Sequence, residues 1–171
     1  MEEQIMNMPA VALRGLTILP GMIAHFDISR ERSLRAVEEA MEQDQKIYLV
    51  TQRNVDSEDP TQEDLYQMGI VADIKQVVRL QNDVVRILVD GISRAALLGF
   101  TGNEKYLEAE ICYCDSNADS LPEDLREAML LGVREAFHRY AAVVGKISKE
   151  LIRQIDQYED LEKLIDYVTN N

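Results

Sequence analysis

Cysteine and aromatic residues are scarce in this sequence. Its 171 residues include two cysteines, three phenylalanines and no tryptophan. Cys112 and Cys114 are too few for a disulfide framework, and residues spaced i, i+2 on a strand point the same way without disulfide geometry. The sequence therefore predicts a protein of a reducing compartment, whose fold depends on a packed core instead of covalent cross-links.

Long apolar runs are also missing. No stretch reaches the ~18 consecutive apolar residues that a membrane span needs. The N-terminus is acidic and is not followed by the apolar segment of a signal peptide. We expect a cytoplasmic protein with no membrane partner.

Positive charge is in short supply. The chain has 18 Lys and Arg against 31 Asp and Glu, which leaves a net charge of −13. Such a surface repels phosphate backbones and anionic lipids, so nucleic acid is an unlikely ligand. The 46% of apolar residues, 8 glycines and 4 prolines are typical of a globular chain of this length with a sizeable core.

The apolar pattern divides the chain into a strand-rich part and a helical part. All four prolines and six of the eight glycines fall in the first 122 residues. Alternating apolar residues predict a hairpin over 69–90, with its turn at 81–83. Its first strand is predicted to be half-buried, with one apolar face formed by Ile70, Ala72, Ile74, Val78 and Leu80. A helix is predicted to begin after Ser29 and to present Leu34, Val37 and Met41. Further strands are predicted over the ranges 11–14, 22–28, 46–53, 95–100 and 106–114.

The last part of the chain has helical periodicity. Gly145 is expected to end a long helix that Pro122 opens, and Ser148 to cap a short one. Residues 161–168 predict a third helix. The apolar stripe of the long helix consists of Leu125, Met129, Val133, Ala136, Phe137, Tyr140 and Val144.

No catalytic or metal-binding pattern is evident. The pair Gly145-Lys146 lacks the first glycine and the hydroxyl residue of a P-loop, and Ser148 fits a helix cap better than a nucleophile. His25 and His138 are predicted to be surface residues, and with the two cysteines they do not form a zinc motif. The acidic run over 56–64 lacks a calcium-loop frame and is predicted to be a solvated loop. We expect no catalytic residue, no metal and no cofactor in this segment.

Three segments in order resemble the N-terminal domain of bacterial Lon, an ATP-dependent serine protease. They are the stretch Val11–Met22, which ends in a Pro-Gly turn, the Arg-Glu-x-Ser-Leu sequence at 30–34, and the hairpin from Gly69 through Ala95 with its Gly-x-x-Arg-Ala sequence. Ala12 stands where this family usually has proline, Leu19 where an aromatic residue is common, and the hairpin tip lacks the usual Asp-Gly. These departures affect turn detail more than identity.

The resemblance implies an α+β fold: a PUA-like β-lobe over 1–118, with a mixed, barrel-like sheet and one inserted helix, followed by a helical lobe over 119–171. It also implies a non-catalytic domain that engages unfolded or degron-bearing proteins and contributes to assembly of a hexameric parent. ATP and Mg²⁺ would bind only in downstream domains. A free-standing binding module with the same domain is the alternative, and a small enzyme using His25 and the acidic loop is a third hypothesis.

Binding of non-native proteins requires exposed apolar surface, because an unfolded segment has no fixed shape. The candidate substrate-binding residues are Leu19, Pro20 and Ile23 at the first turn, and Leu80 and Gln81 at the hairpin tip. The alternative is that Leu19, Ile23 and Leu80 are core residues at strand ends. Burying two such side chains contributes roughly 3 to 6 kcal/mol before association entropy is subtracted, so one domain alone would bind weakly.

Overall fold

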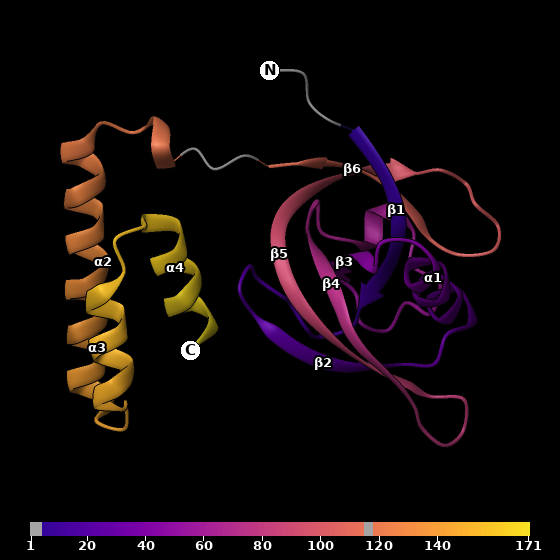
Figure 1. Ribbon diagram of the computed structural model, residues 1–171, viewed down its shortest axis with the longest axis horizontal. Coiled ribbons are helices and arrows are strands. Elements are labelled where there is room, and N and C mark those ends of the chain that lie inside the picture. Colours follow the sequence, from indigo (N-terminus) through magenta and orange to yellow (C-terminus); the bar gives the residue numbers. More distant parts are fainter. Residues whose placement is uncertain (1–4, 115–117) are drawn as a thin grey trace. The chain divides into compact units, whose positions relative to one another are not determined.

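The computed structural model describes residues 5–114 and 118–171. Contacts within the chain separate two compact units, Met1–Cys114 and Asp115–Asn171. We call them the β unit and the helical unit and describe each by itself (Figure 1). The boundary expected at residue 118 lies next to residues 115–117, which are outside the described residues.

The β unit is a mixed sheet that closes on itself. Its strands follow the order β2-β5-β4-β3-β1-β6, and a further pairing of β5 with β6 completes a barrel-like ring. β1 and β3 are parallel and the other pairs are antiparallel. The elements are β1 (Ile5–Leu13), β2 (Ile23–Ile28), α1 (Glu31–Glu42), β3 (Lys46–Thr51), β4 (Met68–Arg79), β5 (Val85–Phe100) and β6 (Glu108–Tyr113), with a 3-10 turn over Gln62–Asp64. This architecture confirms the predicted fold class.

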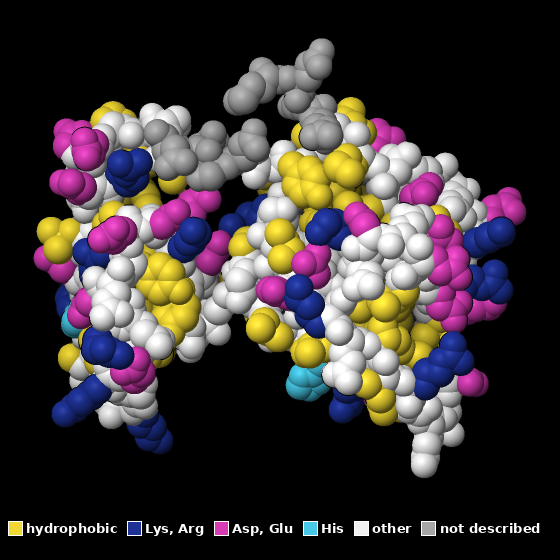
Figure 2. Space-filling view, in the orientation of Figure 1, with side chains coloured by type: hydrophobic (Ala, Val, Ile, Leu, Met, Phe, Trp, Pro, Cys, Tyr) yellow, Lys and Arg dark blue, Asp and Glu magenta, His cyan; other side chains and the backbone are white. Residues whose placement is uncertain are grey.

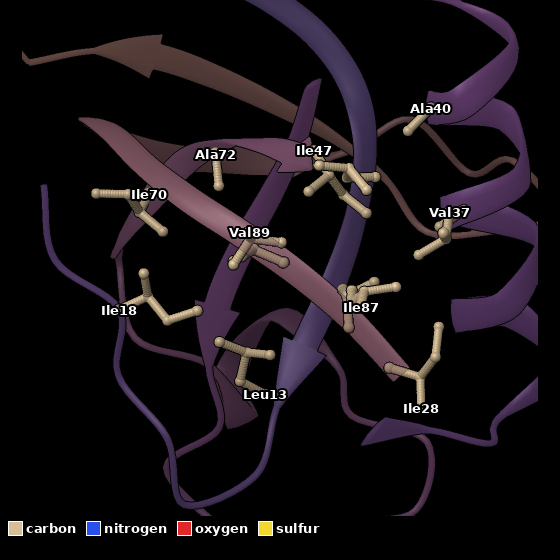
Figure 3. Packing of buried hydrophobic residues seen from close by; sticks show 14 of the residues in the cluster. Leu13, Ile18, Ile28, Val37, Ala40, Ile47, Ile70, Ala72, Ile87 and Val89 are labelled. Carbon is tan, nitrogen blue, oxygen red and sulfur yellow. The ribbon is translucent and has the colours of Figure 1, made fainter. Parts of the chain in front are cut away.

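Both faces of the central strands are buried, where the sequence predicted one buried face. On one face Ile70, Ala72 and Ile87 pack with α1, and Figure 3 shows side chains from β1, β4, β5 and α1 converging there. On the other face Tyr48 and Val71 pack with residues of β5 and β6. The second face is buried because β6 joins β1 to β5 and the closed sheet encloses it.

β5 is one long strand, where two separate strands were predicted. Its pairing with β4 shifts register where Val71 faces Ser93 and Ala72 faces Gly91, so Ile92 is the extra residue of a bulge. A bulge bends a strand without ending it. The N-terminal half of β5 therefore pairs with β2 and its C-terminal half with β6.

The inserted helix α1 differs from its predicted form in its cap and its buried face. Arg30, not Ser29, is the N-cap residue, and it makes no side-chain capping bond. Of the predicted face, Val37 is buried, Leu34 is half-buried and Met41 is exposed. The other buried residues of the helix are small: Ser33, Ala36 and Ala40. Small side chains let the helix lie close to β1 and β3, which the 3/4 spacing of larger residues could not indicate.

The predicted hairpin turn is confirmed. Asn82 and Asp83 both have positive φ angles, 59° and 57°, and the Leu80 N–H donates to the Val84 carbonyl at 2.8 Å. Positive φ at both central residues defines a type I′ turn, whose twist suits a two-strand hairpin. Val78 and Leu80, predicted to continue the buried face of β4, are instead 38% and 41% exposed, because they lie in the projecting tip.

Asp73 of β4 carries a pH-dependent part of the stability. Lys46 Nζ lies 2.8 Å from Asp73 Oδ1 across the β3–β4 pair, and Lys75 Nζ lies 3.2 Å from Oδ2. The hydrogen bond from Lys46 holds the pKa of Asp73 below its ordinary value of 3.8. A carboxyl with a lowered folded-state pKa stabilises the fold above its unfolded pKa, and that contribution is lost as the pH falls through the folded value.

We therefore expect Asp73→Asn to reduce the free energy of unfolding at pH 7, by less than about 1 kcal/mol because the pair is only partly buried. The difference from the parent chain should shrink as the pH falls below about 4. Urea unfolding at a series of pH values measures it. A difference that stays constant from pH 7 to pH 3 would contradict this account.

The helical unit contains α2 (Glu123–Val144), α3 (Lys149–Gln157) and α4 (Leu161–Asn170), after a 3-10 turn over Ala118–Ser120. Gly145 ends α2 with a φ of 65°, and the Ser148 side chain accepts from the Leu151 N–H at 3.1 Å, as predicted. Pro122 is the N-cap residue and precedes the first turn instead of lying in it. The core of the unit consists of Leu130, Phe137, Ala141, Ile155, Leu161 and Leu164.

The apolar stripe predicted for α2 is buried only in part. Phe137 is buried, but Leu125, Met129 and Tyr140 are 47%, 41% and 58% exposed. α2 has 22 residues and is longer than α3 and α4, which have 9 and 10. Within the described residues, no helix is long and apolar enough to cross a bilayer.

Candidate functional site

The first predicted site is a tight turn between β1 and β2. The Met22 N–H donates to the Leu19 carbonyl at 3.1 Å, and Gly21 has a φ of 75°. Proline at the second position and a positive-φ glycine at the third are the residues that a type II turn requires. The sequence Leu-Pro-Gly-Met therefore folds locally into a rigid turn, which we call the Pro-Gly turn (residues 19–22).

The Pro-Gly turn is held against β5 at Gly91. The Gly21 N–H donates to the Gly91 carbonyl at 2.8 Å, and the Gly91 N–H donates to the Met22 carbonyl at 2.9 Å. A Cβ atom on Gly91 would lie 2.3 Å from the Leu19 carbonyl oxygen, so no side chain fits there. Ile18, at 5% exposed, anchors the turn in the core. These contacts hold the apolar turn rigidly against the sheet.

Ile23 is the most exposed large residue of this region. It follows the Pro-Gly turn, pairs with Asp90 of β5 and is 68% exposed, while Leu19 and Pro20 are partly buried. Ile92, 45% exposed, lies diagonally across from it on β5. The alternative that these are core residues is wrong for Ile23, and Leu19 is half-buried. Substrate binding by Leu19, Pro20 and Ile23 stays a prediction. We call Leu19, Pro20, Ile23 and Ile92 the turn surface.

Sequence analysis did not identify Ile92. The sequence gives little indication of an exposed strand residue there, because residues 90–94 are predicted to connect two strands. In the structure Ile92 is the bulge residue of β5, two positions along that strand from Asp90, the partner of Ile23.

The second predicted site, Leu80 and Gln81, lies at the hairpin tip. Leu80 is 41% exposed and Gln81 is exposed. The tip is separated from the turn surface by the length of β2, because Ile28 pairs with Val85 near the tip and Ile23 pairs with Asp90 at the other end. Those positions are about 17 Å apart along the strand. The structure therefore does not bring the five predicted residues together into one site.

A third apolar surface lies within the helical unit. A groove of about 630 Å³ is lined by side chains of α2, α3 and the end of α4. Five of the seven residues of the predicted α2 stripe line it: Val133, Ala136, Phe137, Tyr140 and Val144. The stripe was visible in the sequence, which did not indicate what covers it. Figure 2 shows apolar side chains in several separate areas of the visible surface.

The remaining polar candidates have local structural contacts. His25 lies on the exposed side of β2, as predicted, and His138 contacts Asp156 at 2.8 Å. In the acidic loop, Asp64 accepts from the Thr61 N–H at 2.9 Å and Asp59 lies 3.6 Å from Arg32. Among residues 5–114 and 118–171, no group of three or more His, Cys, Asp or Glu side chains is placed to hold a metal ion.

The described residues thus form an α+β domain of two units: a closed mixed sheet with an exposed apolar turn, and three helices with an apolar groove. The profile of the ATP-dependent protease La (LON) substrate-binding domain matches residues 7–171. The chain belongs to this family of Lon substrate-binding domains, which confirms the resemblance seen in the sequence.

Curated relatives agree with this assignment. The chain is 36% identical to the Lon protease of Lachnoclostridium phytofermentans, 35% identical to that of Clostridioides difficile and 30% identical to Lon protease 1 of Bacillus subtilis. These alignments cover 99%, 96% and 99% of the chain. They cover only 21%, 21% and 22% of the relatives, so the chain spans about a fifth of their length.

Solved structures share the fold. The N-terminal domain of a Mycobacterium avium complex Lon protease superimposes with a TM-score of 0.72 at 17% identity, covering 94% of this chain and 80% of that one. The Lon N-terminal domain protein from Xanthomonas campestris gives a TM-score of 0.55 at 14% identity, covering 96% and 97%. At these identities the likeness concerns architecture alone.

Proposed function

We propose that this domain binds apolar segments of unfolded or degron-bearing proteins for a longer, ATP-dependent protease. The observation that carries the proposal is the exposed isoleucine, Ile23, directly after the rigid Pro-Gly turn. The turn already fixes the backbone next to this side chain. Little conformational entropy is therefore lost when a partner covers the side chain. Unfolded segments supply apolar side chains of no fixed shape, which suits a small convex surface.

The strength of such contacts favours several copies acting together. Burying Ile23 and one neighbour contributes roughly 3 to 6 kcal/mol before the cost of association. A single domain would then bind at millimolar strength or weaker, whereas several copies in one assembly raise the effective concentration of sites. We therefore place this domain in a cytoplasmic, ring-shaped parent, where ATP, Mg²⁺ and peptide-bond cleavage belong to chain outside these residues.

The proposal predicts that Ile23→Ser weakens binding of an unfolded protein about fivefold to tenfold, because most of one isoleucine side chain leaves the contact. A titration of the 171-residue chain with a reduced and alkylated, permanently unfolded protein, followed by NMR, measures this. Leu98→Ser is the matched control, since Leu98 is 43% exposed on β5 but lies outside the turn surface. Equal weakening by both variants would refute a specific role for the turn surface.

A further inference from the structure

A small cavity lies at the beginning of α1, separate from the turn surface. It has a volume of about 400 Å³ and lies between β1, the end of β2 and the first turn of the helix. Its floor is apolar and includes Val11, Phe26 and Ile28. Its rim carries two arginines, Arg14 and Arg30, so the cavity combines an apolar floor with a cationic edge.

The two arginines converge on one point. Arg14 and Arg30 each place an Nη2 atom 3.1 Å from the same acceptor, the Ser57 carbonyl oxygen, so the two nitrogens are no further apart than twice that distance. Arg30 also donates to Gln52 Oε1 at 2.9 Å. These acceptors are neutral, and among the residues described neither guanidinium has a carboxylate within salt-bridge distance.

This pairing of like charges is unusual in a chain with a net charge of −13. Burial, followed by the charge of Arg14, lowers the pKa of Arg30, while Glu58 and Asp59 act in the opposite direction. Glu58 lines the same cavity, so its rim carries two positive charges and one negative charge. The excess positive charge at the rim favours an anion.

A buried hydroxyl and a helix N-terminus add hydrogen-bond donors. Ser33 is 4% exposed and lines the cavity, so its hydroxyl can donate to a ligand there. It belongs to the first turn of the 12-residue helix α1, whose N-cap residue Arg30 provides no side-chain cap. N–H groups at an uncapped helix start favour a negative group.

We propose that this cavity binds the C-terminal carboxylate of a polypeptide whose last side chain is apolar. The carboxylate would lie beside the Ser57 carbonyl, accepting from further N–H groups of Arg14 and Arg30 and from Ser33. The last side chain would cover the floor formed by Val11, Phe26 and Ile28. A small inorganic anion would leave that floor uncovered. This inference rests on the proposed function, because it concerns how the same protein substrates are bound. The cavity would bind their free C-terminus, which the turn surface does not contact.

Three fluorescent ten-residue peptides test the proposal by anisotropy with the 171-residue chain. One ends in leucine with a free carboxylate, the second is its C-terminal amide, and the third ends in glycine with a free carboxylate. The leucine acid should bind about tenfold more tightly than the amide, because charge-assisted hydrogen bonds to guanidinium are lost on amidation. It should also bind more tightly than the glycine acid.

Substitutions in and near the cavity test whether the difference between the acid and the amide arises there. Arg14→Gln should remove most of the difference between acid and amide, and Ser33→Ala should reduce it. Arg35→Gln should leave it unchanged, because Arg35 is an exposed arginine of the same helix that bonds Glu31 and does not line the cavity. Far-ultraviolet circular dichroism shows whether each variant keeps the parent fold.

Equal binding of acid and amide overturns the carboxylate site, and so do equal effects of Arg14→Gln and Arg35→Gln. Equal binding of the leucine and glycine acids, with inorganic phosphate displacing both, identifies a simple anion site and also overturns it. The proposed function is tested by a separate experiment, the titration of Ile23→Ser with the unfolded protein. It is refuted if Ile23→Ser and Leu98→Ser weaken that binding equally. Neither result depends on the other, because Ile23 lies outside the cavity.

Discussion

Gly91→Ala is expected to lower the free energy of unfolding of the β unit by about 3 kcal/mol, a large effect for one methyl group. The added Cβ would lie 2.3 Å from the Leu19 carbonyl oxygen and 3.2 Å from Ile18 Cγ2. The Pro-Gly turn must therefore move away from β5 and lose the hydrogen bonds of 2.8 and 2.9 Å that hold it. Binding of unfolded protein should fall as well, because Ile23 follows this turn directly.

Urea unfolding and the NMR titration measure the two effects of Gly91→Ala. Gly99→Ala is the matched control on the same strand, since the nearest atom to its added Cβ is the end of the Gln62 side chain at 3.8 Å. We expect this control to change stability by less than about 1 kcal/mol. If the two glycine variants unfold alike, the close approach of the Pro-Gly turn to β5 is not what requires glycine at position 91.

Ile155→Ala should unfold the helical unit while the β unit stays folded. Ile155 is 0% exposed at the centre of a core that contains few other large side chains. Truncating a buried isoleucine to alanine costs about 2 to 5 kcal/mol. A unit of 57 residues has little stability to lose, because small domains bury a smaller fraction of their surface.

Hydrogen exchange read residue by residue distinguishes the two units. In the Ile155→Ala variant, amides of α2, α3 and α4 should lose protection while those of β1, β3 and β4 keep it. Ile165→Ala is the control, because Ile165 lies on α4 but is 40% exposed. Loss of protection across all 171 residues would show that the two units do not unfold independently.

The predictions that succeeded rest on local chemistry. Gly145 ends α2 and Ser148 caps α3, because backbone strain and capping bonds involve only neighbouring residues. The turn at Asn82 and Asp83 follows the same logic, since these residue types tolerate positive φ. The two histidines were assigned to the surface from strand alternation and helix periodicity, and both are exposed.

The predictions that failed depended on what lies opposite a residue. Val71 is buried because the sheet closes behind it, and Val78 is exposed because the hairpin extends beyond its neighbours. Tyr140 belongs to an apolar stripe, yet it is 58% exposed because it lines an open groove between α2, α3 and α4. Periodicity shows which side chains share a face and says nothing of whether another element reaches that face.

Sequence alone determined the α+β class, the strand-rich and helical parts, the hairpin, and the family through its ordered segments. Only the tertiary structure decided which apolar residues face water. It separated Leu80 from Ile23, brought Ile92 beside the Pro-Gly turn, and placed Arg14 and Arg30 around one carbonyl oxygen. The reason is that burial and convergence are set by contacts between residues distant in the chain, and strand register, bulges and helix lengths fix those contacts together.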